Sequence, residues 1–566
     1  MKKDSGGCPM RDAPTYADAV QRGVVGDDPL GLAPTNERLY NSAFPGFNNY
    51  VRHIRVYSTI CWMTKQVGLA LEKGAVKTDT EARGLFESAI EKVELALVWA
   101  NQGVQGMAGT QRVFPVHDKP VELKFETFGT SQATLFDAPT YKPSLTSGLR
   151  FLEARSAGKY GCLPYGDALA DAFDEAARDL PGYRWLKAAD RASGRRSQVE
   201  ELASALDVTK PSAGEQVAFL ASFFPKELSE TATNDDRARW LTLQLMLRSV
   251  EAVCKGKESA GEPATATSSE TRACMARGLA TNGTSVVASD VERVQAWWSV
   301  LQVRQLQRLC LETLYCVVER WIAECETDGG SQALEDCIAQ LAVAGHAYVH
   351  ENVRESVSQM EAVFRDLQGG RQSLYESAAR WSPEDAEDES DADVFAHISR
   401  LRDKATLAVD SDGNCDAIAN AYIGLVFCAI ETANLAMNPD ALKAMRADGD
   451  ACSLLRLADL VTRFRDSSIE TFLRHVLKEW VLLRHFAVVG SRSIPFDGKN
   501  RFRFVMGDYG LERFDKSARL PLPGMSADKL DHALMLCEQG GLLVDKGGAY
   551  KLTVAGRRRI QHGSRS

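Results

Sequence analysis

Apolar residues recur every three or four positions over most of the chain, which is the spacing of helices that bury one face. The stretch from Val291 to about His485 is almost entirely of this kind and opens with VERVQAWWSVLQVRQLQRLCLETLYCVVERWIAEC. Residues 37–255 are mixed but mostly helical, with a short strand-like piece in PVELKFETFG. The pattern predicts a mainly α protein, in which a multi-helix body carries a small C-terminal α/β unit.

The C-terminal pattern changes from helix to strand within about thirty residues. Ser526 and Asp528 can cap a helix that has apolar residues at Leu530, Ala533, Leu534 and Cys537. The glycine pair that follows ends this helix, and two short apolar runs then flank the turn Lys546-Gly547-Gly548. Helix, strand, glycine turn and strand are the order of a winged helix, so we expect this fold near the C-terminus.

Composition shifts divide the rest of the chain. RFRFVMGDYGLERF, from Arg501, alternates apolar and basic residues and is expected to be a strand that joins the C-terminal sheet. The segment 256–290 is rich in Ala, Ser, Thr and Gly, which indicates a linker or solvated insertion. The predicted parts are a flexible arm at 1–36, a mostly helical domain at 37–255, this linker, a helical domain at 291–485, and a small sheet with the winged helix at 486–566.

Charge and cysteine usage narrow the class of protein. The net charge of −9 over 566 residues indicates that any nucleic-acid site is a local patch and not the whole surface. The thirteen cysteines are scattered without a CxxC pair and no signal peptide is evident, which favours reduced thiols in a cytoplasmic protein. The most apolar stretch, 417–437, contains Asn420, Glu431 and Asn434, so a buried helix is favoured over a membrane span.

Basic residues near the C-terminus could contact DNA. Around the predicted helix Asp528, Asp531 and Glu538 outweigh Lys529, so this helix is poorly suited to enter a groove of DNA. Arginines are the better candidates because they can grip phosphates without reading sequence: Arg501, Arg503, Arg557, Arg558 and Arg559. The alternative is that the unit docks a protein or a second copy of the chain.

Motifs for catalysis are weak. The sequence has no P-loop, GxGxxG, GxSxG or HExxH and no metal-spaced Cys/His set, so neither a metal nor a cofactor is expected. This favours a non-catalytic subunit. The most concrete enzyme alternative is a divergent metal-dependent nuclease, in which Asp118 and Glu122 would hold the ion and Lys124 would steady the nucleophile.

One N-terminal helix could bind a partner or a phosphate. In FPGFNNYVRHIRVYSTICWMTKQV, Arg52, Arg55 and Trp62 lie on one helical face at steps of three and four residues. Arginines beside an aromatic ring suit an acidic ligand. The favoured alternative is that these arginines bond carboxylates inside the domain and that the aromatic side chains belong to the core.

The same stretch resembles a group of uncharacterised bacterial proteins that carry domain-of-unknown-function labels and often lie in phage-defence islands. The resemblance rests on Phe44-Pro45-Gly46, Arg52, Arg55, Tyr57 and Trp62. It extends to GCLPYGDALADAF, DDRARWLTLQLML, WWSVLQVRQLQRLCLETLY and RHFAVVGSRSIPFDGKNRFRFVMGDYGL.

What the resemblance implies is a component of an anti-phage defence system that works with partner proteins of its operon, such as a helicase-type or other ATPase and a nuclease. It implies no catalytic residue. We therefore expect a recognition or scaffold subunit that touches DNA, a partner subunit, or both. The oligomeric state stays open.

Overall fold

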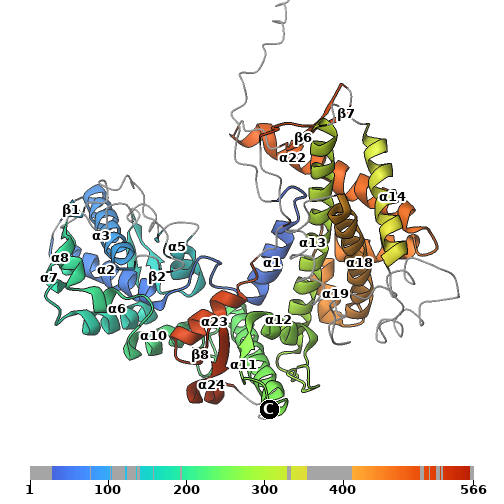
Figure 1. The fold of residues 1–566 in the computed structure, drawn as a ribbon. Coiled ribbons are helices and arrows are strands. Elements are labelled where there is room, and N and C mark those ends of the chain that lie inside the picture. The colour runs from blue at the N-terminus through green and yellow to red at the C-terminus, as the bar shows by residue number, and fades with distance from the viewer. Residues whose placement is uncertain are drawn as a thin grey trace, which may run out of the picture. The chain divides into compact units, whose positions relative to one another are not determined.

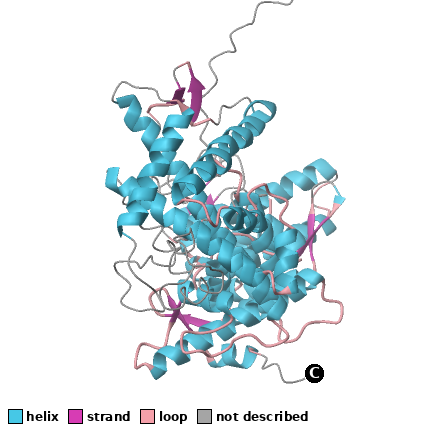
Figure 2. Cartoon of the chain, turned by 90° about the vertical axis from the view of Figure 1, so that its right-hand side faces the viewer, coloured by secondary structure: helices cyan, strands magenta, loops and turns pink. Residues whose placement is uncertain are grey.

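The protein is described by a computed structural model. It covers residues 28–352, 411–497 and 502–560, except for 75, 77, 102–103, 105–106, 108–121, 124–134, 137–139, 157–158, 191–193, 328–332, 509, 518–522 and 524–526. Helices dominate this part of the chain, and the strands are few and short (Figure 2). The prediction of a mainly helical protein is confirmed.

The chain divides into two compact units whose segments alternate along the sequence. Unit 1 comprises 1–34, 304–433 and 449–525, and unit 2 comprises 35–303, 434–448 and 526–566. One continuous helix, α13 (Glu292–Thr327), contributes its first residues to unit 2 and the rest to unit 1. The units are therefore described separately.

Unit 2 is built around the helix α2 (Ile54–Glu72), which is buried along most of its length because its apolar residues lie on several faces. Tyr57 of α2 packs its ring against Tyr141, Phe151 and Phe219 at 5.0–5.6 Å. The helices and strands of the first half of unit 2 are α1 (Ala33–Ala43), α3 (Asp79–Ala100), β1 (Glu122–Leu123), α5 (Tyr141–Pro143), η3 (Ser144–Gly148), β2 (Leu152–Ala154), β3 (Tyr160–Cys162), α6 (Pro164–Ala177), α7 (Tyr183–Lys187), β4 (Gly194–Arg195), α8 (Arg196–Glu200), α9 (Ala203–Leu206) and α10 (Ala213–Phe223).

The second half of unit 2 joins segments that are distant in sequence. Figure 1 shows the C-terminal elements beside α11. Its elements are α11 (Asn234–Ser259), β5 (Ala266–Thr267), α12 (Ser268–Arg277), the start of α13, α19 (Pro439–Arg446), α23 (Leu530–Gln539), β8 (Leu543–Asp545), β9 (Ala549–Leu552) and α24 (Val554–Arg559).

Residues 256–290, expected to be a linker or solvated insertion, instead contain β5 and α12. Thr267 and Glu270 form a reciprocal capping box that starts α12, and Cys274 and Met275 are buried. Residues 274–276 are buried because α12 lies against α11, whereas residues 258–263 and 281–285 are exposed.

Unit 1 packs its helices around the later part of α13. Arg304, fully buried, donates to the carbonyl oxygen of Cys452 at 2.7 Å. Tyr315 packs its ring against His485 and stacks with Phe504. Its other elements are α14 (Leu334–Asn352), α18 (Ser411–Leu435), α20 (Leu454–Arg463), α21 (Ile469–His475), η6 (Val476–Leu482), α22 (Leu483–Asp497), β6 (Phe504–Gly507) and β7 (Gly510–Arg513).

The strand expected from RFRFVMG is present as β6, but its expected partner was wrong. β6 pairs with β7 in an antiparallel hairpin, Phe504 opposite Arg513, and not with the C-terminal sheet. The hairpin belongs to unit 1, whereas the C-terminal elements from α23 onward belong to unit 2. The predicted compact part at 486–566 is therefore split between the two units.

Helix α18 contains the most apolar stretch of the chain. By length and composition, Cys415–Leu435 could cross a membrane, and 72% of its most apolar window is buried inside the structure. The core helix of a soluble protein passes the same test, so the feature is weak evidence for either location.

Candidate nucleic-acid interface

The C-terminal elements follow the order predicted from the sequence: helix α23, strand β8, glycine turn, strand β9. β8 and β9 are antiparallel, with Val544 opposite Lys551. β9 also pairs with β5, from the middle of the chain, through Ala266 and Tyr550. The result is a three-stranded sheet in the order β5, β9, β8.

Local chemistry explains the turn and the short helix after it. Gly547 and Gly548 both adopt positive φ, where residues with a Cβ are strained, and the amide of Gly548 donates to the Asp545 carboxylate at 2.7 Å. Thr553 then caps α24 by accepting from the amide of Gly556 at 3.0 Å. The wing, defined here as β8, the turn and β9, is thus joined to α24 by a single capping residue.

Four cations project from the wing and α24. Lys546, Arg557 and Arg558 are exposed and Lys551 is half-buried. Within the described part of the chain, no ion pair involves any of these four side chains. We call Lys546, Lys551, Arg557 and Arg558 the wing cations.

Two of these positive charges, Lys551 and Arg557, act on the thiol of Cys254 on α11. Burial raises the pKa of Cys254, and the positive charges of Lys551, Lys257 and Arg557 act against that rise. Lys257 is paired with Glu270 at 2.5 Å. The uncompensated positive charge in this region therefore comes from the wing and α24.

The third arginine of the C-terminal run is turned inward. Arg559 donates to the carbonyl oxygen of Phe224 and lies over the Phe224 ring at 5.4 Å. Its own carbonyl accepts from Gln244 on α11 at 3.0 Å. Arg559 therefore fastens α24 to unit 2, so the predicted trio separates into two outward arginines and one anchor.

The predicted arginines near residue 500 are not part of this surface. Arg503 forms two hydrogen bonds with the buried Glu319, at 2.5 and 2.7 Å, inside unit 1. A guanidinium held in this way by a carboxylate is not available to a phosphate. Arg501 lies outside the described residues.

The helix before the wing is packed on most sides. Lys529, just before this helix, donates to the carbonyl oxygen of Phe44 at 2.9 Å. The side-chain amide of Asn49 donates to the carbonyl oxygen of Ala527 at 3.0 Å. Near its end, Gln539 accepts from the amide of Ile54 at 2.9 Å. Residues 44–54 therefore pack against both ends of α23.

Charges on α23 also oppose contact with a polyanion. Asp531 is exposed, and burial lowers the pKa of His532 to about 4, which keeps this imidazole neutral near pH 7. The buried Asp528 is held by Arg272 of α12 at 2.5 Å.

The predicted N-terminal arginine face divides in the same way between interior and surface. Arg55 is 2% exposed and pairs with the buried Glu215 at 2.7 Å, while also donating to the carbonyl of Lys210. Trp62 is buried and its indole N–H donates to Asp174 at 2.8 Å. Arg55 and Trp62 are thus used within unit 2, and Arg52 is the member of the set that stays partly exposed.

The residues of the nuclease alternative fall mainly outside the described part of the chain. Glu122 begins β1, which pairs with β4 through Arg195. Asp118 and Lys124 lie outside the described residues. Among the residues that the structure describes, no group of three or more His, Cys, Asp or Glu is placed to hold a metal ion.

Sequence reasoning missed three contributors to the surface: Lys546, Lys551 and β5. Lys546 was assigned only to the turn, and Lys551 was not named as a cation, although it alternates with the buried Tyr550 and Leu552. The strand β5, which pairs with the central strand β9, gave no usable signal. Its two residues lie in an Ala/Thr-rich stretch and are too few to show a periodicity.

Comparison with known proteins assigns no family to this chain. No family model matches the sequence, and no curated protein or solved structure is significantly similar to it.

Proposed function

We propose that unit 2 carries an interrupted winged helix that binds the phosphate backbone of DNA. The three helices would be α11, α12 and α23, and the three strands β5, β8 and β9. In a winged helix the last strand lies between the other two, and the order β5, β9, β8 has this arrangement. The contacts of α12 with α11 and with α23 support it as well.

In this proposal the second and third helices are separated by residues 278–529. That segment includes most of unit 1. The insertion explains why sequence inspection detects only the last three elements of the motif, α23, β8 and β9.

The proposed mode of contact uses the wing and α24. The third helix of such folds usually enters the major groove, but here residues 44–54 pack against both ends of α23 and its exposed side carries the acidic Asp531. The single observation that carries the proposal is the set of four wing cations, which make no ion pair with described residues in a protein of net charge −9. Such cations bind phosphates and read little sequence.

The test is a salt titration of affinity for short DNA duplexes of unrelated sequence. We expect Arg557→Gln combined with Arg558→Gln to weaken binding equally on every duplex. Each lost phosphate contact should reduce the slope of log affinity against log salt by about 0.9. Lys546→Gln combined with Lys551→Gln should act in the same direction.

A charge-matched control is available on the same unit. Arg184 of α7 and Arg195 of β4 are exposed arginines in the first half of unit 2, and replacing both by Gln should leave affinity and slope unchanged. Equal losses in the control and wing variants would reduce the effect to net charge. Unchanged binding in the wing variants would mean that this surface docks a protein instead.

The wider role is proposed on the sequence resemblance alone. We propose a non-catalytic recognition or scaffold subunit of an anti-phage defence system, acting in the cytoplasm with an ATPase or nuclease partner. The nuclease alternative with Asp118, Glu122 and Lys124 stays a prediction. Magnesium-dependent cutting of plasmid DNA that Glu122→Ala abolishes would replace the scaffold role with an enzymatic one.

A further inference from the structure

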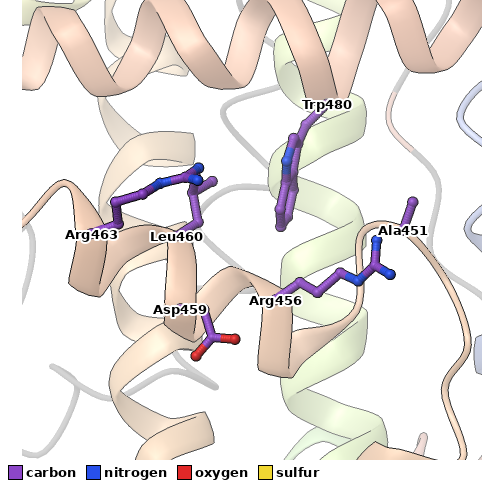
Figure 3. Close-up of a pocket in the computed structure, with 6 residues that line it drawn as sticks. All are labelled: Ala451, Arg456, Asp459, Leu460, Arg463 and Trp480. Atoms are coloured by element: carbon purple, nitrogen blue, oxygen red, sulfur yellow. The ribbon is translucent and has the colours of Figure 1, made fainter.

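Unit 1 contains a pocket that the proposed DNA contact does not use. Its volume is about 400 Å³, within the range of small-molecule sites, roughly 300–1,000 Å³. Helix α20 and the segment η6 form its walls (Figure 3). It is lined by Ala451, Arg456, Asp459, Leu460, Arg463 and Trp480.

Two of the lining arginines share one face of α20. Arg456 and Arg463 are seven residues apart, which is two helical turns, so both reach the same side of the helix. Ser453 caps α20 by accepting from the amide of Arg456, which fixes the start of the helix. Arg463 lies over the ring of Phe464 at 5.3 Å, which orients its guanidinium.

Trp480 stands between these arginines in Figure 3. It belongs to η6, a π-helical stretch, and such wide turns are frequent at functional sites. The indole is half-buried, and its N–H has no hydrogen-bond partner among the described residues. One flat aromatic surface is therefore presented beside two guanidinium groups.

Charge in the pocket favours an anion. Arg456, Asp459 and Arg463 are all exposed, and none forms an ion pair with a described residue. In Figure 3 the two arginines flank the indole of Trp480, and the Asp459 carboxylate is directed away from it.

We propose that this pocket binds a free mononucleotide. Its base would stack on Trp480, and its phosphate would accept hydrogen bonds from Arg463, which extends toward the indole in Figure 3, while Arg456 adds positive charge on the other side of the ring. A bare phosphate would leave the aromatic surface unused, and an uncharged ring would leave the Arg463 guanidinium unused. A nucleotide matches both halves of the site.

Calorimetric titration of the full chain with AMP and UMP tests the proposal. Both should bind, whereas adenosine and ribose 5-phosphate, which each lack one half of the ligand, should bind at least tenfold more weakly. Arg463→Gln should weaken AMP binding roughly tenfold or more, since it removes a charged hydrogen bond, and Arg456→Gln should weaken it less. Trp480→Leu should weaken AMP while leaving ribose 5-phosphate unchanged.

Arg465→Gln is the matched control, because Arg465 is an exposed arginine just beyond α20 that does not line the pocket. Its AMP affinity should equal that of the unaltered protein, and thermal melting checks that every variant folds. The proposal is overturned if AMP does not bind, if ribose 5-phosphate binds as well as AMP, or if Arg463→Gln behaves like Arg465→Gln. None of these results bears on the wing cations, which lie in unit 2.

Discussion

At the scale of single residues, Lys529 is the most unusual side chain of the C-terminal region. It is 2% exposed, adopts a positive φ of 64°, and lies 5.4 Å from the rings of both Tyr40 and Phe47. Burial lowers its pKa to about 7, because the charged ammonium loses its hydration. The amine still donates to the carbonyl of Phe44, which fixes the start of α23.

The low pKa predicts a specific pH dependence of stability. Between about pH 7 and 10.5 the unfolded chain holds a proton on Lys529 that the folded chain lacks, so the free energy of unfolding rises with pH across this window. The contribution is up to about 1.4 kcal/mol per pH unit. Urea denaturation at several pH values should show this rise in the unaltered protein relative to Lys529→Met.

The comparison with Lys529→Met matters because buried thiols act in the opposite direction. Burial raises the pKa of Cys537 from its ordinary value near 9 to about 12, so this thiol lowers the free energy of unfolding as the pH rises above about 9. The thiols are common to both proteins and drop out of the difference. Parallel pH profiles for the two proteins would contradict the assignment of Lys529.

At the scale of elements, α24 depends on a close approach that only glycine permits. A Cβ on Gly556 would collide with the carbonyl oxygen of Leu542 and with the side chain of Leu552. Together with Thr553 and Arg559, this contact sets the direction in which Arg557 and Arg558 leave the helix.

Gly556→Ala should therefore displace α24. We expect a loss of about 1–3 kcal/mol in the free energy of unfolding, as for other overpacked sites. Weaker DNA binding should follow although every wing cation is still present. Chemical denaturation and the salt titration measure the two effects, and Val554→Ala, at an exposed position of the same helix, should change neither.

At the scale of the whole molecule, each compact unit is assembled from segments that are far apart in the sequence. The C-terminal elements obtain a third strand from β5, which pairs with the central strand β9, and they pack against residues 44–54. Both contributions come from hundreds of residues earlier in the chain, and the sequence between β5 and α23 includes most of unit 1.

A peptide of residues 526–566 should therefore not fold by itself. It would lose the pairing of Tyr550 with Ala266 and the cover over Leu530 and Leu534, which are fully buried in the intact protein. Hydrogen exchange should show unprotected β9 amides in the peptide and protected ones in the intact protein. Native-like protection in the peptide would show that the C-terminal elements are independent of the rest.

The sequence by itself determined the local structure of this protein. The three-to-four-residue spacing predicted the helices, and the turn Lys546-Gly547-Gly548 located the hairpin between β8 and β9. These features depend on backbone preferences and periodic burial, which act over a few residues and can be read directly.

Only the tertiary structure decided which charged residues are available and which strands meet. Arg55 and Arg503 look like surface cations in sequence, yet each finds a buried carboxylate more than 150 positions away, while Arg557 and Arg558 find none among the described residues. The same holds for β5 beside β9 and for Trp480 beside Arg456 and Arg463. An ion pair or a strand pairing depends on which residues of another segment lie opposite. The local sequence does not determine which segment that is.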